Sequence, residues 1–474
     1  MTNFGFPMNK FSGQIAIIIA ALMLAGPSVS RGQDFFRDIG TSRSSGGIGP
    51  VTPSDYTYDD ASPSGLRALR PGEDLSVTEE QEETDKFNFA LGNFRFGLAL
   101  GVGIEYNDNI NLADHGRESD FIFRPILNVD SEWRISDLNT LRFNVGISYA
   151  KYFEHSEFDT HGVLISPTSE LALTLYTGPV KWTARDRFSY QEDSYDIPDL
   201  TNQAIYGRWE NQAGLEGDWT VNQSLDITLG FDNYNLWTTQ DSTDPAFALQ
   251  DRTINTILLK PTLAVNPAIK VGVNGAYSFI HFKDADRSDA HDLLVGPFIE
   301  WQLSEYTNLY LEGGYQDLAY EGTSNYSSAA QVGAGLTPAE AATLEDNSKS
   351  GSYYIRFEID NRPTEFFRHR LSFSKTAEIG FVSNYITLYN VEYDADWKVM
   401  EKLELGPTVF YEHYSTSGDL GEKADRFGAA VGLRYHFTNN LTLGLDYRWL
   451  LKNSNLPDLS YYQDLVFLSI YYKF

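Results

Sequence analysis

The chain has 474 residues, of which 42% are hydrophobic and 14% aromatic, with a formal net charge of −29 and no cysteine. The lack of cysteine excludes disulfides, thiolate metal sites and cysteine nucleophiles. The acidity disfavours a nucleic-acid partner, because binding phosphates requires clustered lysine and arginine.

The N-terminal region divides into two segments. Residues 1–30 carry Lys10, an apolar run over 15–24, and the small residues Ser28 and Ser30, which predicts a cleaved signal peptide. The run is too short for a membrane-spanning helix, which needs about 18 apolar residues or more. Residues 31–86 are rich in serine, glycine, proline and aspartate, which predicts a flexible, acidic periplasmic linker.

Alternation begins at Phe94. Every even position from Phe94 to Tyr106 is apolar, and the odd positions between them are small or charged. Since successive strand side chains point to opposite faces, this segment has one apolar face and one small or polar face. About ten such residues cross a bilayer as a tilted strand.

The same alternation continues to Phe474 and gives eighteen strand candidates within 87–474. Short turns recur after an aromatic residue, as at 133–136, 219–222, 301–304 and 397–400, and the longer polar connections fall at 191–207, 238–249, 283–290, 321–350 and 415–423. Alternating short turns and long loops are typical of outer-membrane barrels. We therefore predict an all-β, transmembrane, antiparallel up-and-down barrel of about 18 strands in the bacterial outer membrane.

Aromatic residues mark the predicted membrane boundaries. All eight tryptophans fall near predicted strand ends, where an aromatic ring can stay apolar while its N–H stays hydrated. The belt on the side of the short turns is predicted to contain Trp133, Trp182, Trp219, Trp301, Trp397 and Tyr435. An amphipathic last strand with Tyr472 and a terminal Phe474 predicts a signal for outer-membrane assembly.

Charged residues gather on the face opposite the apolar one. They cannot face lipid, because an arginine or lysine at the bilayer midplane costs roughly 2–4 kcal/mol. The predicted pore-lining residues are Arg95, Glu105, Arg124, Asp130, Arg142, Arg185, Arg187, Glu216, Lys260, Glu300, Glu312, Arg356, Glu358, Asp394, Arg434, Asp446 and Arg448. A lumen filled by salt bridges, without conduction, is the alternative interpretation.

The longest predicted loop, 321–350, is a candidate constriction. Thr337, Pro338 and Glu340 form a capping box, which predicts a short helix over 338–344. The sequence leaves open whether this loop folds into the pore or stands outside it.

The segment Gly101–Tyr106, followed by Asn107-Asp108-Asn109-Ile110, resembles the opening of the β-barrel porin 2 family. The resemblance continues through the repeated aromatic turns to Phe474. It implies an outer-membrane barrel, and some similar proteins accompany exopolysaccharide export systems; the family has no agreed catalytic residues. Asn107, Asp108 and Asn109 could also suggest calcium, but the glycine and downstream glutamate of a calcium loop are missing, which favours local turn hydrogen bonds.

No nucleophile, histidine and acid can be singled out as a triad among the plentiful serines and aspartates, so we predict no catalytic residues, no metal and no cofactor. The leading hypothesis is passive diffusion of small polar solutes, with a cation or neutral preference set by the acidity. The alternative is a conduit for an exported polysaccharide with periplasmic export partners, and a third class is a non-conducting barrel. Expected partners are outer-membrane lipid and lipopolysaccharide and the barrel assembly machinery.

Overall fold

The computed structural model describes residues 87–192, 197–239, 247, 249–284, 287–321, 349–418 and 421–474. The predicted signal peptide, the linker over 31–86 and the helix expected over 338–344 lie outside these residues. Within the described part of the chain, no helix is long and apolar enough to cross a membrane.

Strands make up most of the described chain, and all belong to one sheet. The first half contains β1 (Phe89–Leu91), β2 (Phe94–Asn107), β3 (Asp120–Arg134), β4 (Thr140–Ser148), β5 (Lys151–Tyr152), β6 (Leu164–Ile165), β7 (Glu170–Thr177), β8 (Val180–Gln191), β9 (Arg208–Asn222), β10 (Leu225–Thr238) and β11 (Arg252–Asn266). The second half contains β12 (Ile269–Phe282), β13 (Ala290–Ser304), β14 (Thr307–Tyr320), β15 (Ser350–Thr364), β16 (Phe367–Ile379), β17 (Tyr385–Met400), β18 (Leu403–Thr416), β19 (Lys423–His436), β20 (Leu441–Ser454) and β21 (Tyr461–Lys473). A 3₁₀ turn, η5 (Ser156–Phe158), follows β5.

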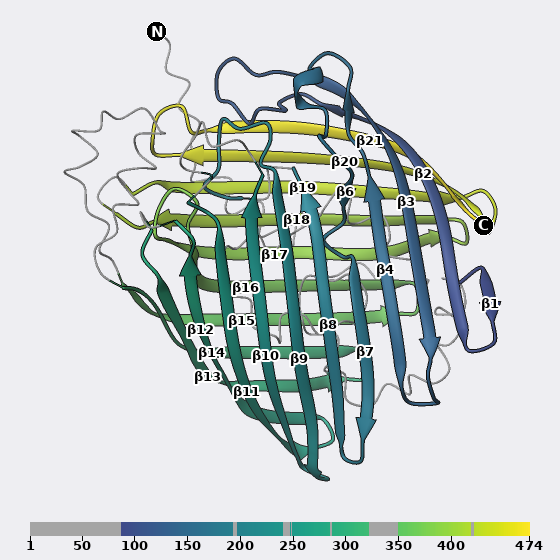
Figure 1. Ribbon diagram of the computed structural model, residues 1–474, viewed down its shortest axis with the longest axis vertical. Helices are drawn as coiled ribbons and strands as arrows, with labels where there is room; N and C mark the ends of the chain where they lie inside the picture. The colour runs from purple at the N-terminus through teal and green to yellow at the C-terminus, as the bar shows by residue number, and fades with distance from the viewer. Residues whose placement is uncertain are drawn as a thin grey trace.

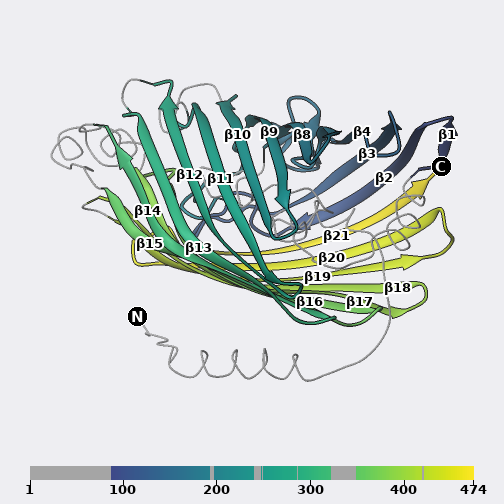
Figure 2. The same cartoon turned by 90° about the horizontal axis from the view of Figure 1, so that it is seen from below.

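Eighteen of these strands, β2–β4 and β7–β21, form a closed antiparallel barrel, as predicted. The first wall strand, β2, pairs with the last, β21, with Leu100 opposite Tyr472 and Ile104 opposite Leu468. Closure satisfies the backbone groups that an open sheet edge would expose to lipid. In Figure 1, the strands of the front wall cross those of the back wall steeply, and Figure 2 shows β8–β11 and β16–β21 on opposite sides of the interior.

The two faces of the wall differ as the alternation predicted. On β2 the apolar residues Leu100, Val102 and Ile104 are exposed, whereas Gly101 and Gly103 are buried. These glycines make room for inward rings of β21, because a Cβ on Gly103 would lie 2.3 Å from the ring of Phe467. Gly101 and Gly103 therefore allow aromatic rings of β21 to pack closely against β2, inside the seam between the first and last wall strands.

The barrel departs from regularity in three places. β1 forms a small hairpin with β2 before the wall begins. The short strands β5 and β6 continue the lines of β4 and β7 beyond irregular breaks. The third departure lies at β15 and β16, whose pairing ends at Ile355 and Lys375 although both strands continue. There the side chain of Gln316 bonds the backbone N–H and carbonyl of Ala377, so the end of β16 lies over the inner face of β14.

Candidate functional site

The inner face of the barrel is charged, and most of its charges are buried. Twelve of the residues predicted to line the pore are buried in the structure: Glu105, Arg124, Arg185, Glu216, Lys260, Glu300, Glu312, Glu358, Asp394, Arg434, Asp446 and Arg448. The other five are partly exposed: Arg95, Asp130, Arg142, Arg187 and Arg356. A wide aqueous channel would leave wall side chains exposed, so this interior is closely packed.

Ion pairs between adjacent strands account for much of that packing. Arg124 on β3 donates to Glu105 on β2 at 2.9 Å. Arg434 on β19 pairs with Asp446 on β20 at 2.6 Å. Buried charges are tolerated when they are paired and hydrogen-bonded, and these pairs also tie neighbouring strands together.

Other buried carboxylates meet neutral donors or a lysine. Glu312 accepts hydrogen bonds from the amide of Asn274 at 3.0 Å and from the hydroxyls of Tyr354 and Tyr310. Lys260 approaches Glu300 at 3.4 Å and lies over the ring of Phe298. Sequence alternation places such residues on the inner face but does not reveal which of them share a partner.

Apolar residues from three loops enter the barrel at the end with the long connections, which we call the mouth, and pack with residues of the neighbouring strands in a buried cluster, the mouth cluster. Tyr206 from the β8–β9 connection, Phe247 from the β10–β11 connection and Phe381 from the β16–β17 connection pack ring against ring. Ile197 and Leu200 add aliphatic contacts from the first of these loops. We call the described part of that loop, 197–206, the crossing segment.

The crossing segment spans the interior and is fixed on the opposite wall. The carboxylate of Asp199 accepts the backbone N–H groups of Phe381 and Val382 at 2.7 and 3.2 Å. Thr201 accepts from the fully buried Lys452 on β20 at 2.8 Å. These contacts hold the segment across the mouth as a constriction.

Burial raises the pKa of Asp199 above its ordinary value, and the nearby carboxylate of Glu422 acts in the same direction. The two backbone donors and Lys452 oppose this rise without cancelling it. Asp199 therefore holds a proton more tightly when the crossing segment is docked than when its carboxyl is in water.

Arg287 joins the other inward loops. Its guanidinium donates to the side chain of Gln250 at 3.1 Å and to the carbonyl of Gly380 at 2.9 Å. It also lies over the ring of Phe282. A fully buried arginine that links two loops indicates an ordered assembly at the mouth.

This constriction was not predicted from the sequence. The loop over 321–350 was the candidate there, with its position inside or outside the pore left open, and its residues 322–348 lie outside the described part of the chain. The sequence did contain one signal for it. The connection over 191–207 carries the apolar residues Ile197, Leu200 and Ile205, which a loop exposed to water does not need. The buried residues also include the aromatic side chains of Tyr354, Tyr414 and Phe467.

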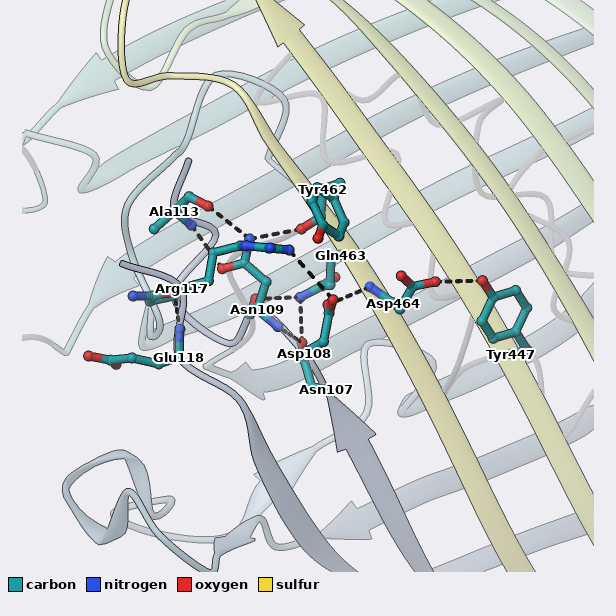
Figure 3. A network of polar contacts seen from close by, with 11 residues as sticks. Asn107, Asp108, Asn109, Ala113, Arg117, Glu118, Tyr447, Tyr462, Gln463 and Asp464 are labelled. Carbon is teal, nitrogen blue, oxygen red and sulfur yellow. Dashed lines mark hydrogen bonds and ion pairs between the residues drawn. The ribbon is translucent and has the colours of Figure 1, made fainter. Parts of the chain in front are cut away.

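The motif after β2 fastens the seam of the barrel (Figure 3). Asn109 donates to the carbonyls of Ala113 at 3.0 Å and Tyr462 at 2.8 Å, and its N–H bonds the Asn107 side chain. Asp108 accepts the N–H of Asp464 at 2.7 Å. The predicted turn hydrogen bonds are present, and they extend across to β21.

A neighbouring group of exposed side chains has the spacing for a metal ion. Asp114, His115 and Asp458 bring their ligand atoms within 4.8 Å of one another, in the β2–β3 and β20–β21 loops. The side chains of His115 and Asp458 are 82% and 77% exposed. Groups as exposed as these are common without an ion, so no cofactor site follows from them.

The predicted belt and assembly residues lie on the outside of the barrel. Exposed rings are found at Trp133, Trp182, Trp219, Trp301, Trp397 and Tyr435. Tyr472 and Phe474 are also exposed, with their rings packed edge to face, and the N–H of Phe474 bonds the carbonyl of Leu98. Aromatic rings at strand ends suit a membrane–water interface.

A closed antiparallel barrel with an apolar exterior, exposed aromatic rings at its strand ends and a charged interior is a bacterial outer-membrane β-barrel. No protein-family model matches the sequence, and no curated protein sequence matches it.

Several solved outer-membrane proteins have a similar structure. OpdK of Pseudomonas aeruginosa, solved with vanillate, aligns with a TM-score of 0.42 and 11% identity over 80% of this chain and 98% of its own. OccAB4 of Acinetobacter baumannii gives 0.42 and 14%, over 82% of this chain and 100% of its own. A loop-deletion mutant of OmpT from Vibrio cholerae gives 0.34 and 10%, over 81% and 100%.

Proposed function

We propose that this chain is a porin-like outer-membrane channel for the passive diffusion of small polar solutes. The observation that carries the proposal is the barrel wall itself, which is apolar outside and lined inside by charged and hydrogen-bonding side chains on most strands. Barrels of 16–18 strands are wide enough to enclose an aqueous path unless something fills it.

The filled mouth makes this a selective channel rather than a wide one. The crossing segment and its apolar cluster lie in the path, so passage of a solute requires their displacement. Loops that open and close on the microsecond timescale or slower would then set the conducting fraction.

We infer a preference for cations or neutral solutes from the distribution of charge. The inner wall carries both signs, joined in pairs such as Glu105–Arg124 and Arg434–Asp446. The net charge of −29 therefore acts mainly outside the paired interior, where it would enrich cations near the openings.

We also propose kinship with the β-barrel porin 2 family, supported by the segment 101–110 and its role at the seam. Lipid, lipopolysaccharide and the barrel assembly machinery are the proposed partners, the last through Tyr472 and Phe474. The polysaccharide conduit is not favoured, because inward rings such as Tyr206 and Tyr354 pack in buried clusters instead of forming an open stacking track.

Reconstitution of the purified protein into planar lipid bilayers tests the proposal. We expect stepwise conductance in potassium chloride and uptake of small neutral solutes in liposome-swelling assays. Folded protein that inserts but never conducts, even after the crossing segment is released by mutation, would refute a channel function.

A further inference from the structure

Six polar side chains cross the inner face of the barrel on six consecutive strands. They are Gln212, Asp232, Thr256, Ser278, Asp292 and Gln316, on β9 to β14, and all are buried. We call them the polar row. Its four central members are direct cross-strand neighbours in the order Asp232, Thr256, Ser278, Asp292.

Hydrogen bonding within the polar row is nearly symmetric and incomplete. The hydroxyls of Thr256 and Ser278 bond each other at 2.8 Å in the centre. Gln212 donates to Oδ1 of Asp232 at 2.7 Å, and Gln316 donates to Oδ2 of Asp292 at 3.0 Å.

The other carboxylate oxygens, Oδ2 of Asp232 and Oδ1 of Asp292, are buried without a hydrogen-bond partner. These two side chains are only 2% and 3% exposed. A buried acceptor without a donor costs free energy, so the row carries two positions that a ligand could satisfy.

Apolar layers enclose the row on both sides. Ile254, Ile280 and Leu318 of the mouth cluster lie on one side, and Leu258, Ala276 and Leu294 lie on the other. Each layer is offset by two residues along the same strands, since side chains on one face repeat every second residue. Apolar residues would pack here at less cost, which is why a row of acids and hydroxyls indicates a site.

Charges near the row indicate the class of ligand. Arg185 lies beside Asp232, since a Cβ on Gly214 would be 2.7 Å from Oδ2 of Asp232 and 3.5 Å from Nε of Arg185. Because a guanidinium already stands beside Asp232, a ligand ammonium group is not required there. Hydroxyl groups can donate to the two free oxygens and exchange hydrogen bonds with the central hydroxyls.

We propose that the polar row is a binding site for an uncharged, polyhydroxylated solute inside the channel. The hydroxyl edges of such a solute meet the row, and its C–H faces meet the apolar layers on either side. The mouth cluster borders the row on one side, and the end of β16 lies over it at Gln316. The site therefore becomes accessible when the crossing segment and the end of β16 move together. This proposal deepens the channel function and rests on it for the route of access.

Glucose serves as the uncharged probe and 1,4-diaminobutane as the cationic one. Binding is measured by calorimetry on the folded protein in detergent, and solute entry by current fluctuations in bilayers. Asp232→Leu/Asp292→Leu removes both acceptors at similar volume, whereas Asp232→Asn/Asp292→Asn removes the charge but keeps an acceptor oxygen. Asp226→Leu, a change on the same face of β10 outside the row, is the control. Heat-modifiable migration in gels verifies that each barrel is folded.

We expect the leucine pair to weaken glucose binding on the order of tenfold or more, because it removes two hydrogen-bond acceptors for the solute. The asparagine pair should stay within about threefold of wild type, as should the control. Unchanged glucose binding in the leucine pair overturns the site. The site is also overturned if the wild type binds diaminobutane but not glucose and the asparagine pair loses the diaminobutane binding. Row-dependent glucose binding without any conductance would instead overturn the channel and keep the site.

Discussion

Asn109 joins three parts of the chain at the seam of the barrel. Its side chain bonds the backbone of Ala113 in the β2–β3 loop and the carbonyl of Tyr462 on β21. Arg117 adds a contact over the ring of Tyr462 at 3.8 Å. A single buried amide thus fixes both the loop and the alignment of the first strand with the last.

Replacing Asn109 by alanine should lower the free energy of unfolding by about 1–3 kcal/mol, because buried backbone groups would lose their partners. The measurement is urea unfolding in lipid vesicles, followed by tryptophan fluorescence. Asn111→Ala is the matched control, since this partly exposed asparagine bonds only within its own loop, and it should change stability by less than about 0.5 kcal/mol. Equal stability of the two variants would show that the seam does not depend on this contact.

At the scale of elements, the crossing segment differs from the strands around it. Most wall strands pair with a neighbour on each side, whereas the segment is held by backbone hydrogen bonds at Asn202 and Tyr206 and by side chains such as Leu200 and Asp199. Regions with so few attachments open at lower free energy than the wall. The segment is therefore the natural moving part of this channel.

Leu200→Asp should release the crossing segment. A carboxylate placed in an apolar cluster costs several kcal/mol unless it is paired, which exceeds what a few loop contacts provide. We expect larger single-channel conductance and faster glucose uptake. Val163→Asp adds the same charge at an exposed apolar residue of another loop and should leave both quantities unchanged. If both variants conduct like wild type, the segment does not obstruct the path.

Docking of the same segment should depend on pH through Asp199. Its pKa is raised in the docked state by burial, then by Glu422, with Lys452 opposing, while the free carboxyl has a pKa near 3.8. The docked state therefore binds the proton more tightly, so docking strengthens as pH falls toward 3.8 and weakens as pH rises through the raised value.

Conductance recorded between pH 7 and pH 4 should consequently fall severalfold on acidification, and Asp199→Asn should flatten this dependence. Asp458→Asn, at an exposed carboxyl of the β20–β21 loop, should keep it. A wild-type profile that rises in acid would contradict the sign.

The sequence predicted the wall far better than the mouth, for a physical reason. Lipid imposes a two-residue period on every strand. The outward face of Leu100, Val102 and Ile104 can therefore be predicted from the strand's own sequence, without knowing which strands lie beside it. The crossing segment has no such period. Its apolar residues are buried only because they pack against Phe247 and Phe381, which are distant in the chain, so their burial could not be predicted from the local sequence. The polar row was hidden for the same reason, because its register joins six separate strands.

For the molecule as a whole, charge separates into a paired interior and an acidic remainder. Pairs such as Arg370 with Asp394 and Arg124 with Glu105 place opposite charges side by side inside the wall. The net charge of −29 then arises mainly from side chains in contact with solvent, where salt screens it. Selectivity that arises there must depend on ionic strength, unlike selectivity from a buried site.

Reversal potentials in potassium chloride gradients distinguish these two origins. The screening length is about 10 Å at 0.1 M salt and about 3 Å at 1 M, so cation preference should be clear at low salt and approach unity at high salt. Asp232→Asn/Asp292→Asn should leave the ratio unchanged, because the polar row is proposed to select by hydroxyl groups instead of charge. Cation preference that persists at 1 M salt and disappears in this variant would locate ion selection at the polar row. A preference for anions would contradict the proposal that the net negative charge enriches cations at the openings.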